Sequence, residues 1–176
     1  MPIRFELLSA PEIEAALPAL VALLQDAVDS GASVGFMPPM PATGAAQFWY
    51  DVAASVAAGH RVVLVAHDEN TGHIVGTGQL VLATNPNAPH RAEVAKVMVH
   101  QMARRQGIGQ QLMQALEAEA RHQGRTTLIL DTRHGDPAEQ LYQRQGFRFV
   151  GAIPEYFINA DGRSHATAVY YKLLEK

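Results

Sequence analysis

A strand, a glycine turn and a helix follow one another over residues 94–113, and no other stretch constrains the fold as much. Residues 94–99 are mostly apolar and rich in β-branched side chains, which predicts a buried strand. After a short polar turn, apolar residues such as Ile108 and Leu112 recur at helical spacing, so we expect a helix to begin near Gly107. The sequence thus predicts a sheet strand that leads directly into a helix.

The turn between this strand and this helix has the chemistry of an anion site. Gly107 and Gly109 allow the backbone to approach a ligand closely. The first N–H groups of a helix lack intrahelical partners, and the helix dipole there favours negative charge. Arg104 and Arg105 precede the glycines, and guanidinium groups bind phosphate in a bidentate manner. We therefore expect a pyrophosphate group to bind here, the simpler alternative being a tight turn that contains glycine.

Two common phosphate-binding motifs do not fit this turn. The dinucleotide fingerprint requires a third glycine where this chain has Leu112, and an acidic residue further on. A P-loop ends in Gly-Lys-Ser/Thr, which is absent here.

Composition excludes several function classes. The chain has 176 residues, of which 48% are hydrophobic, as expected for one globular domain. A net charge of −3 argues against nucleic-acid binding, and the lack of cysteine excludes disulfides, thiolate metal sites and a cysteine nucleophile. We see no signal peptide and no apolar run of membrane-spanning length, so we expect a cytoplasmic protein. The histidines show no metal-ligand spacing and Gly-x-Ser-x-Gly does not occur, so neither a metal nor a serine hydrolase is expected.

The remaining segments alternate between strand and helix patterns. Strands are predicted at residues 3–7, 61–66, 73–82, 94–99 and 127–130, from residue 147 onward, and at residues 167–173. Helices are predicted at residues 11–28, 43–59, 107–124 and 137–146. We expect Ser9 and Glu12 to form a capping box, Pro18 to kink or break the first helix, and Thr43 to cap the second.

Residues 31–41 are rich in glycine and proline but also contain Val34, Phe36, Met37 and Met40. A loop exposed to solvent would be more polar. Two interpretations remain open, an apolar linker packed against the core and a wall of a substrate site.

Two motifs carry a resemblance to a known family. Arg104-Arg105-Gln106-Gly107-Ile108-Gly109 resembles the acetyl-CoA signature of the Gcn5-related N-acetyltransferases (GNAT), Gln/Arg-x-x-Gly-x-Gly/Ala. Ala138-Glu139-Gln140-Leu141-Tyr142-Gln143-Arg144-Gln145-Gly146-Phe147 resembles the family's Ala-x-x-Leu-Tyr-x-x-x-Gly-Phe. The predicted order of elements is also similar over nearly the whole chain.

The resemblance implies a single α/β (α+β) GNAT domain over residues 1–176. Its mixed sheet would have about seven strands and about four helices, and would splay between the fourth and fifth strands. The implied cosubstrate is acetyl-CoA, and its implied contacts are Val97, Met98, Val99, Arg104, Arg105, Gln106, Gly107, Ile108, Gly109, Gln110, Ala138 and Tyr142. Many members have an asparagine that bonds the pantetheine arm where this chain has Gly135, so the chain departs from the family's pattern at this contact.

A narrower resemblance is to the tabtoxin-resistance acetyltransferases, which acetylate the amino group of an amino-acid toxin that contains a β-lactam. It is carried by Gly-Ala-Ser-Val-Gly-Phe-Met at 31–37, Arg-Ala-Glu-Val-x-Lys-x-Met-Val at 91–99 and Asp-Gly-Arg-x-His-x-Thr-Ala at 161–168.

The chemical requirements of acetyl transfer from a thioester to an amine indicate which residues are candidates for catalysis. Tyr142 is the candidate general acid for the leaving thiolate, because a phenol can protonate sulfur or share its proton. A backbone N–H near Met98 or Val99 would polarise the acetyl carbonyl. Glu93 is the candidate base for the amine, the alternative being an ion pair with Arg91 or Lys96. Asp131 rivals Glu93 as the base, or anchors the ammonium group.

The expected acceptor is a small amine, such as an amino-acid-like compound, a toxin or an antibiotic. We expect Phe36, Met37, Asp131, Tyr156 and Arg163 to bind it, with Arg163 and His165 meeting a carboxylate. Arg163 as a solvated turn residue is the alternative. Two other functions stay open, a non-catalytic acyl-CoA-binding module and a protein or peptide N-acetyltransferase. We expect a monomer or homodimer that binds neither nucleic acid nor membrane.

Overall fold

The computed structural model describes residues 1–175, in which five α-helices and a short 3₁₀ helix accompany seven strands. The strands are β1 (Ile3–Leu7), β2 (Arg61–Asp68), β3 (Ile74–Leu82), β4 (Arg91–Val99), β5 (Thr127–Arg133), β6 (Arg148–Ile158) and β7 (Ser164–Leu173). The helices are α1 (Ala10–Ala15), α2 (Leu17–Asp29), α3 (Ala42–Ala57), the 3₁₀ helix η1 (Gln101–Ala103), α4 (Ile108–His122) and α5 (Ala138–Arg144).

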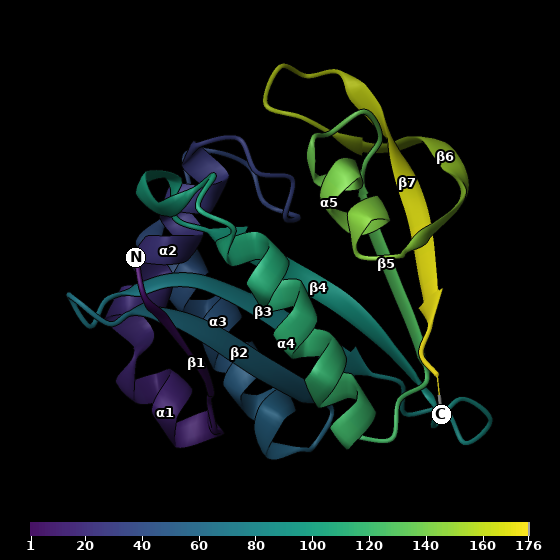
Figure 1. The fold of residues 1–176 in the computed structure, drawn as a ribbon. Coiled ribbons are helices and arrows are strands. Elements are labelled where there is room, and N and C mark those ends of the chain that lie inside the picture. Colours follow the sequence, from purple (N-terminus) through teal and green to yellow (C-terminus); the bar gives the residue numbers. More distant parts are fainter. Residues whose placement is uncertain (176) are drawn as a thin grey trace.

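The strands form one mixed sheet in the order β1-β2-β3-β4-β5-β7-β6. Every neighbouring pair is antiparallel except β4 and β5, which run parallel because α4 connects them. Helices α2 and α3 lie behind the sheet in Figure 1, and α4 crosses in front of it. The predicted α/β fold with a seven-stranded mixed sheet is confirmed.

Each face of the sheet has its own apolar cluster, because successive strand residues point to opposite faces. On β2, Leu64 and Ala66 pack toward α4, whereas Val63 and Val65 pack toward α2 and α3. The cluster behind the sheet contains Trp49, which is fully buried and donates its indole N–H to the Leu20 carbonyl at 2.9 Å. This hydrogen bond joins α3 to α2 within the layer behind the sheet.

The two halves of the sheet separate at its centre. Strands β4 and β5 pair over three positions, and Glu93 opposite Ile129 is the last of them. Beyond Glu93, the two strands diverge toward the top of Figure 1. The backbone groups of β4 that face this opening have no partner on β5, so they remain available to a ligand. The predicted splay between the fourth and fifth strands is confirmed.

A β-bulge lies on β4 within the splayed part. Thr77 and Gln79 of β3 are two residues apart, but their partners Met98 and Ala95 are three residues apart. Lys96, inside the bulge, has a φ of 53°, which L-residues rarely adopt. The alternation of side chains therefore changes at this point of β4.

The local predictions are confirmed in part. The expected break near Pro18 is confirmed, because α1 ends at Ala15 and α2 begins at Leu17, with Pro18 in its first turn, where the missing N–H is tolerated. Ser9 and Glu12 form the predicted capping box. Thr43 does not cap α3, because Pro41 occupies the N-cap and Thr43 lies inside the first turn. Two hydrogen bonds hold the chain just before this helix start, because the Gln25 amide donates to the Met40 carbonyl and the Met40 N–H donates to Asp29.

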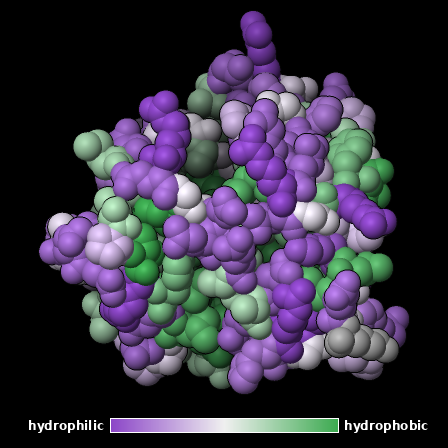
Figure 2. All heavy atoms as spheres, in the orientation of Figure 1, coloured by the Kyte–Doolittle hydropathy of each residue, from purple (hydrophilic) through white to green (hydrophobic). Residues whose placement is uncertain are grey.

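The outer surface mixes polar and apolar side chains. Figure 2 shows a mainly hydrophilic face on which hydrophobic side chains form small groups. The edge strand β6 exposes several large apolar residues, namely Phe149, Val150, Ile153, Tyr156 and Ile158. No helix among residues 1–175 is long and apolar enough to cross a membrane.

Candidate active site

A cavity of about 750 Å³ opens where β4 and β5 part. The loop after α2 forms one side of it, the end of β6 and the following turn form another, and β4 and β5 supply its charged residues. Seven of the predicted site residues line it together, namely Phe36, Met37, Glu93, Val97, Asp131, Tyr142 and Tyr156. They come from separate parts of the chain, so the fold brings them together.

Glu93 is half-buried at the last paired position of β4. Burial and, to a smaller extent, the charge of Asp131 raise the pKa of the Glu93 carboxyl, while Lys96 and Arg61 oppose that shift. Among residues 1–175, Glu93 forms no ion pair with Arg91 or Lys96, the partners of the alternative interpretation. A carboxylate whose pKa is raised toward neutrality is suited to accept a proton.

Asp131 lies on β5 near Glu93, and its position is fixed from β7. The buried hydroxyl of Thr167 donates to Asp131 Oδ2 at 2.7 Å, and the same hydroxyl oxygen lies 3.0 Å from the Thr132 carbonyl oxygen. Asp131 itself is exposed to the cavity. The carboxylate is thus held in one orientation while it remains able to meet a cationic group.

Tyr142 reaches the cavity from α5, and only 9% of it is exposed. Its ring packs beside Tyr170 and Phe147, with centroid distances of 6.4 and 6.2 Å. Burial, followed by the charges of Asp136 and Asp131, raises the pKa of Tyr142 to about 12. The phenol therefore stays protonated at neutral pH and can donate a hydrogen bond into the cavity.

Residues 31–38, here called the acceptor wall, join α2 to the segment before α3. Phe36 packs edge-on against Phe48 at a centroid distance of 5.3 Å, so the aromatic ring is anchored to α3. Met37 is exposed and Val34 is half-buried. The segment packs against the core, as the first interpretation expects, and it also lines the cavity, while its role as a wall of a substrate site stays a prediction.

The segment of residues 104–110, here called the phosphate turn, leads into α4, which begins directly after Gly107, close to the predicted start. Gly107 is the N-cap of α4 with a φ of 80°, and Arg105 has a φ of 61°. A Cβ on Gly107 would meet only the end of the Gln111 side chain, at 3.8 Å, so space remains above the helix N-terminus. The four N–H groups that begin α4 face that space, as an anion site requires.

Gly109 and Ala138 have packing roles that the sequence did not indicate. A Cβ on Gly109 would lie 3.4 Å from Leu141 of α5, so this glycine allows α4 and α5 to approach each other. Ala138 begins α5 and packs against the α4 side of the core. Ile108 is fully buried, so it can contribute only its backbone to a ligand.

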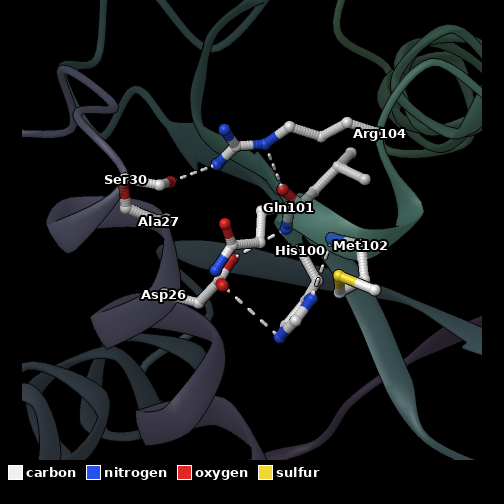
Figure 3. A network of polar contacts seen from close by, with 8 residues as sticks. Asp26, Ala27, Ser30, His100, Gln101, Met102 and Arg104 are labelled. Atoms are coloured by element: carbon white, nitrogen blue, oxygen red, sulfur yellow. Dashed lines mark hydrogen bonds and ion pairs between the residues drawn. The ribbon is translucent and has the colours of Figure 1, made fainter.

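The side chain of Arg104 forms hydrogen bonds within the protein. Its Nε donates to the Val99 carbonyl at 3.1 Å, and its guanidinium reaches the Ser30 hydroxyl at the end of α2 (Figure 3). Arg105 and Gln106 are exposed beside it. We therefore assign Arg104 to positioning the phosphate turn, which leaves Arg105 as the cation better placed to meet a phosphate.

Arg163 and His165 do not line the cavity, although the preceding Asp161 does. Arg163 is exposed in the turn before β7, where its backbone N–H donates to Asp161 at 2.9 Å. His165 stacks on Phe157 with a centroid distance of 5.9 Å. The structure thus places both apart from the other predicted acceptor residues and favours the interpretation of Arg163 as a solvated turn residue.

The cavity contains a cation that the site prediction missed. Lys96 lines it, and its ammonium lies 5.8 Å from the centre of the Phe36 ring. Strict alternation along β4 would place Lys96 on the same face as Val94, toward α4. A charged residue within an apolar strand was the available signal, but a single sequence does not reveal a bulge.

A family model described as Acetyltransferase (GNAT) family matches residues 22–147. The chain belongs to this family. Its members include proteins of closely similar architecture, as the solved structures show. Ribosomal-protein-alanine N-acetyltransferase from Brucella melitensis is 27% identical, with a TM-score of 0.78 over 99% of this chain and 100% of that chain.

Two further solved structures resemble this GNAT chain in fold. An N-acetyltransferase from Staphylococcus aureus is 20% identical, with a TM-score of 0.81 over 99% of this chain and 100% of that chain. A phosphinothricin acetyltransferase from Sinorhizobium meliloti, solved in complex with acetyl-CoA, is 20% identical, with a TM-score of 0.79 over 99% of this chain and 89% of that chain.

Proposed function

We propose that this GNAT protein transfers the acetyl group of acetyl-CoA to the amine of a small, amino-acid-like acceptor. The observation that carries the proposal is the convergence of Glu93, Asp131 and Tyr142 in one cavity at the point where β4 and β5 separate. A proton acceptor and a proton donor then face the same enclosed space. Acyl transfer to an ammonium group requires both.

Acetyl-CoA fits features on the α4 side of the opening. The N–H groups at the start of α4, together with Arg105, would hold the pyrophosphate. The β4 backbone groups beyond Glu93 that lost their β5 partners would pair with the pantetheine arm. One of their N–H groups, near Met98 or Val99, would stabilise the negative charge that develops on the acetyl oxygen.

Proton transfer is assigned to three residues. Glu93, with its raised pKa, takes a proton from the acceptor ammonium, and Asp131 holds that ammonium in place. Tyr142 donates a hydrogen bond to the departing sulfur. Because the pKa of Tyr142 is about 12 and that of a thiol is roughly 8.5, the phenol stabilises the thiolate without losing its own proton completely.

The size of the cavity favours a small acceptor. About 750 Å³ lies within the range of small-molecule sites, and the acceptor wall and the end of β6 border it. The resemblance to tabtoxin-resistance acetyltransferases suggests a toxin as one such acceptor. The Brucella melitensis structure instead supports a protein N-terminus as the second candidate.

Tyr142→Phe tests the enzyme against a non-catalytic acyl-CoA-binding module. We expect kcat to fall by roughly 10²-fold or more, while the Kd for acetyl-CoA changes little. Turnover is measured by thiol release with free amino acids, simple amines and peptides that begin with alanine, and Kd by calorimetric titration. Absence of turnover by the unmodified protein on all three acceptor classes would support the binding module, and turnover on peptides alone would support the protein acceptor.

A further inference from the structure

The β4 bulge decides where the Lys96 side chain lies. Val94 and Val97 both pack on the α4 side of the sheet although they are three residues apart, and Met98 packs on the opposite side. The extra residue that this spacing requires is in the bulge, where Lys96 has its positive φ. The bulge therefore places Lys96 in the cavity, on the same side as the acceptor wall.

The Lys96 ammonium lies between the sheet and the acceptor wall. A Cβ on Gly35 would be 3.3 Å from Lys96 Nζ, and the Phe36 ring lies 5.8 Å away. Among residues 1–175, no carboxylate forms an ion pair with this ammonium. A half-buried cation without an anionic partner is costly unless a ligand supplies one.

We propose that Lys96 binds an anionic group of the acceptor, so that the preferred acceptor is an amine that also carries a carboxylate or similar oxyanion. This proposal rests on the proposed function for the identity of the site. Asp131 and Glu93 supply negative charges to the cavity lining and Lys96 supplies a positive charge. A zwitterionic amino acid matches both kinds of charge, because its ammonium and its carboxylate carry the opposite charges.

The charge of Lys96 is not fully compensated by its surroundings. Burial, followed by the charge of Arg61, lowers the pKa of Lys96, and the carboxylates of Glu93 and Asp131 partly offset that shift. A bound oxyanion would favour the charged ammonium further. A role limited to neutralising Glu93 and Asp131 would instead favour direct ion pairs, which the structure does not form.

The test compares matched probes that differ only in a carboxylate. Leucine is paired with isopentylamine, and γ-aminobutyrate with propylamine, so that two distances between amine and carboxylate are sampled. Binding to the CoA-loaded protein is measured by calorimetry, independently of turnover, for the unmodified protein and for Lys96→Met, Lys96→Arg and Arg163→Ala. Circular dichroism and CoA affinity verify that each variant is folded.

We expect the unmodified protein to bind at least one carboxylated probe more tightly than its matched amine. Lys96→Met should lower the affinity for that probe by about tenfold or more. The simple amine should bind equally well or better, because the variant lacks the positive charge that repels its ammonium. Lys96→Arg should restore part of the preference, and Arg163→Ala should leave it intact.

Three outcomes would overturn the inference. The unmodified protein could show no preference for either carboxylated probe, or Lys96→Met could weaken the binding of both members of a pair equally. The third outcome is a preference that is lost in Arg163→Ala but kept in Lys96→Met. Turnover of the same probes separates this inference from the proposed function. Selective binding through Lys96 without any acetyl transfer would refute the enzyme and leave the anion site standing.

Discussion

At the scale of single residues, the site depends on charges that the fold partly removes from water. Glu93 illustrates this, because burial raises its pKa and so makes ionisation costly in the folded state. The same burial makes the carboxylate a better proton acceptor near neutral pH. Under the proposed function, the burial that lowers stability at neutral pH also favours proton transfer, and the two effects can be measured separately.

Glu93→Gln should therefore lower activity and at the same time relieve an unfavourable charge. Because the folded-state pKa lies above the unfolded value, the stability linked to Glu93 is fully present below about pH 4 and is lost as the pH rises through the folded pKa. At neutral pH we expect the variant to unfold at an equal or higher temperature than the unmodified protein, with the gap closing below about pH 4.

The activity of Glu93→Gln is measured across the same pH range. We expect kcat to fall by roughly 10²-fold or more and the rise of activity with pH to disappear. Glu14→Gln, on the exposed face of α1, is the matched control and should change neither property. A retained pH-dependent rise in Glu93→Gln would transfer the base role to Asp131.

At the scale of elements, the phosphate turn depends on one backbone conformation. Gly107 ends the turn with a φ of 80°, and α4 begins at the next residue. Glycine adopts this conformation without strain, and asparagine tolerates it better than most other residues. The conformation leaves the helix N-terminus open, so charge at position 107 can be tested without changing shape.

Gly107→Asp and Gly107→Asn are nearly isosteric and differ by one negative charge. If the pyrophosphate binds over Gly107, the Asp variant should bind acetyl-CoA at least roughly tenfold more weakly than the Asn variant. Calorimetric titration gives both affinities, and thermal unfolding compares their stabilities. Equal affinities in the two variants would place the pyrophosphate elsewhere.

At the scale of the whole molecule, helix α2 connects the two halves of the site. Asp26, whose side chain is 8% exposed, accepts the Gln101 backbone N–H at 2.9 Å and pairs with His100 at 3.4 Å (Figure 3). Asp29, one turn later, accepts the Met40 backbone N–H at 2.9 Å. One carboxylate thus fixes the approach to the phosphate turn, and the other fixes the far end of the loop that contains the acceptor wall.

Asp26→Ala and Asp29→Ala should accordingly change the KM values of different substrates. We expect Asp26→Ala to raise the KM for acetyl-CoA, and Asp29→Ala to raise the KM for the acceptor amine. Each lost charge-assisted hydrogen bond should lower the free energy of unfolding by about 1–3 kcal/mol. Steady-state kinetics with each substrate varied in turn distinguishes them, and identical changes in both KM values for both variants would contradict this division.

The sequence by itself determined the elements and the turn between β4 and α4. Apolar periodicity, Ser9, Pro18 and the glycines near 107, 124 and 146 act locally, so a reader of the chain can predict strands, helices and where they end. The prediction that Glu93, Asp131 and Tyr142 belong to one site rested on the resemblance to a family whose members share this fold. The strand lengths and the cap of α3 were less accurate, because distant hydrogen bonds set them.

Only the tertiary structure decided which charges face the acceptor. Arg163 lies outside the cavity because the turn before β7 leaves it in solvent. The Arg104 side chain donates hydrogen bonds to the Ser30 hydroxyl and the Val99 carbonyl. Lys96 lies in the cavity because the register between β3 and β4 shifts by one residue at the bulge. A bulge changes the face of a side chain without changing its neighbours in sequence, so the pairing between strands, and not the local pattern, selects the cation of the site.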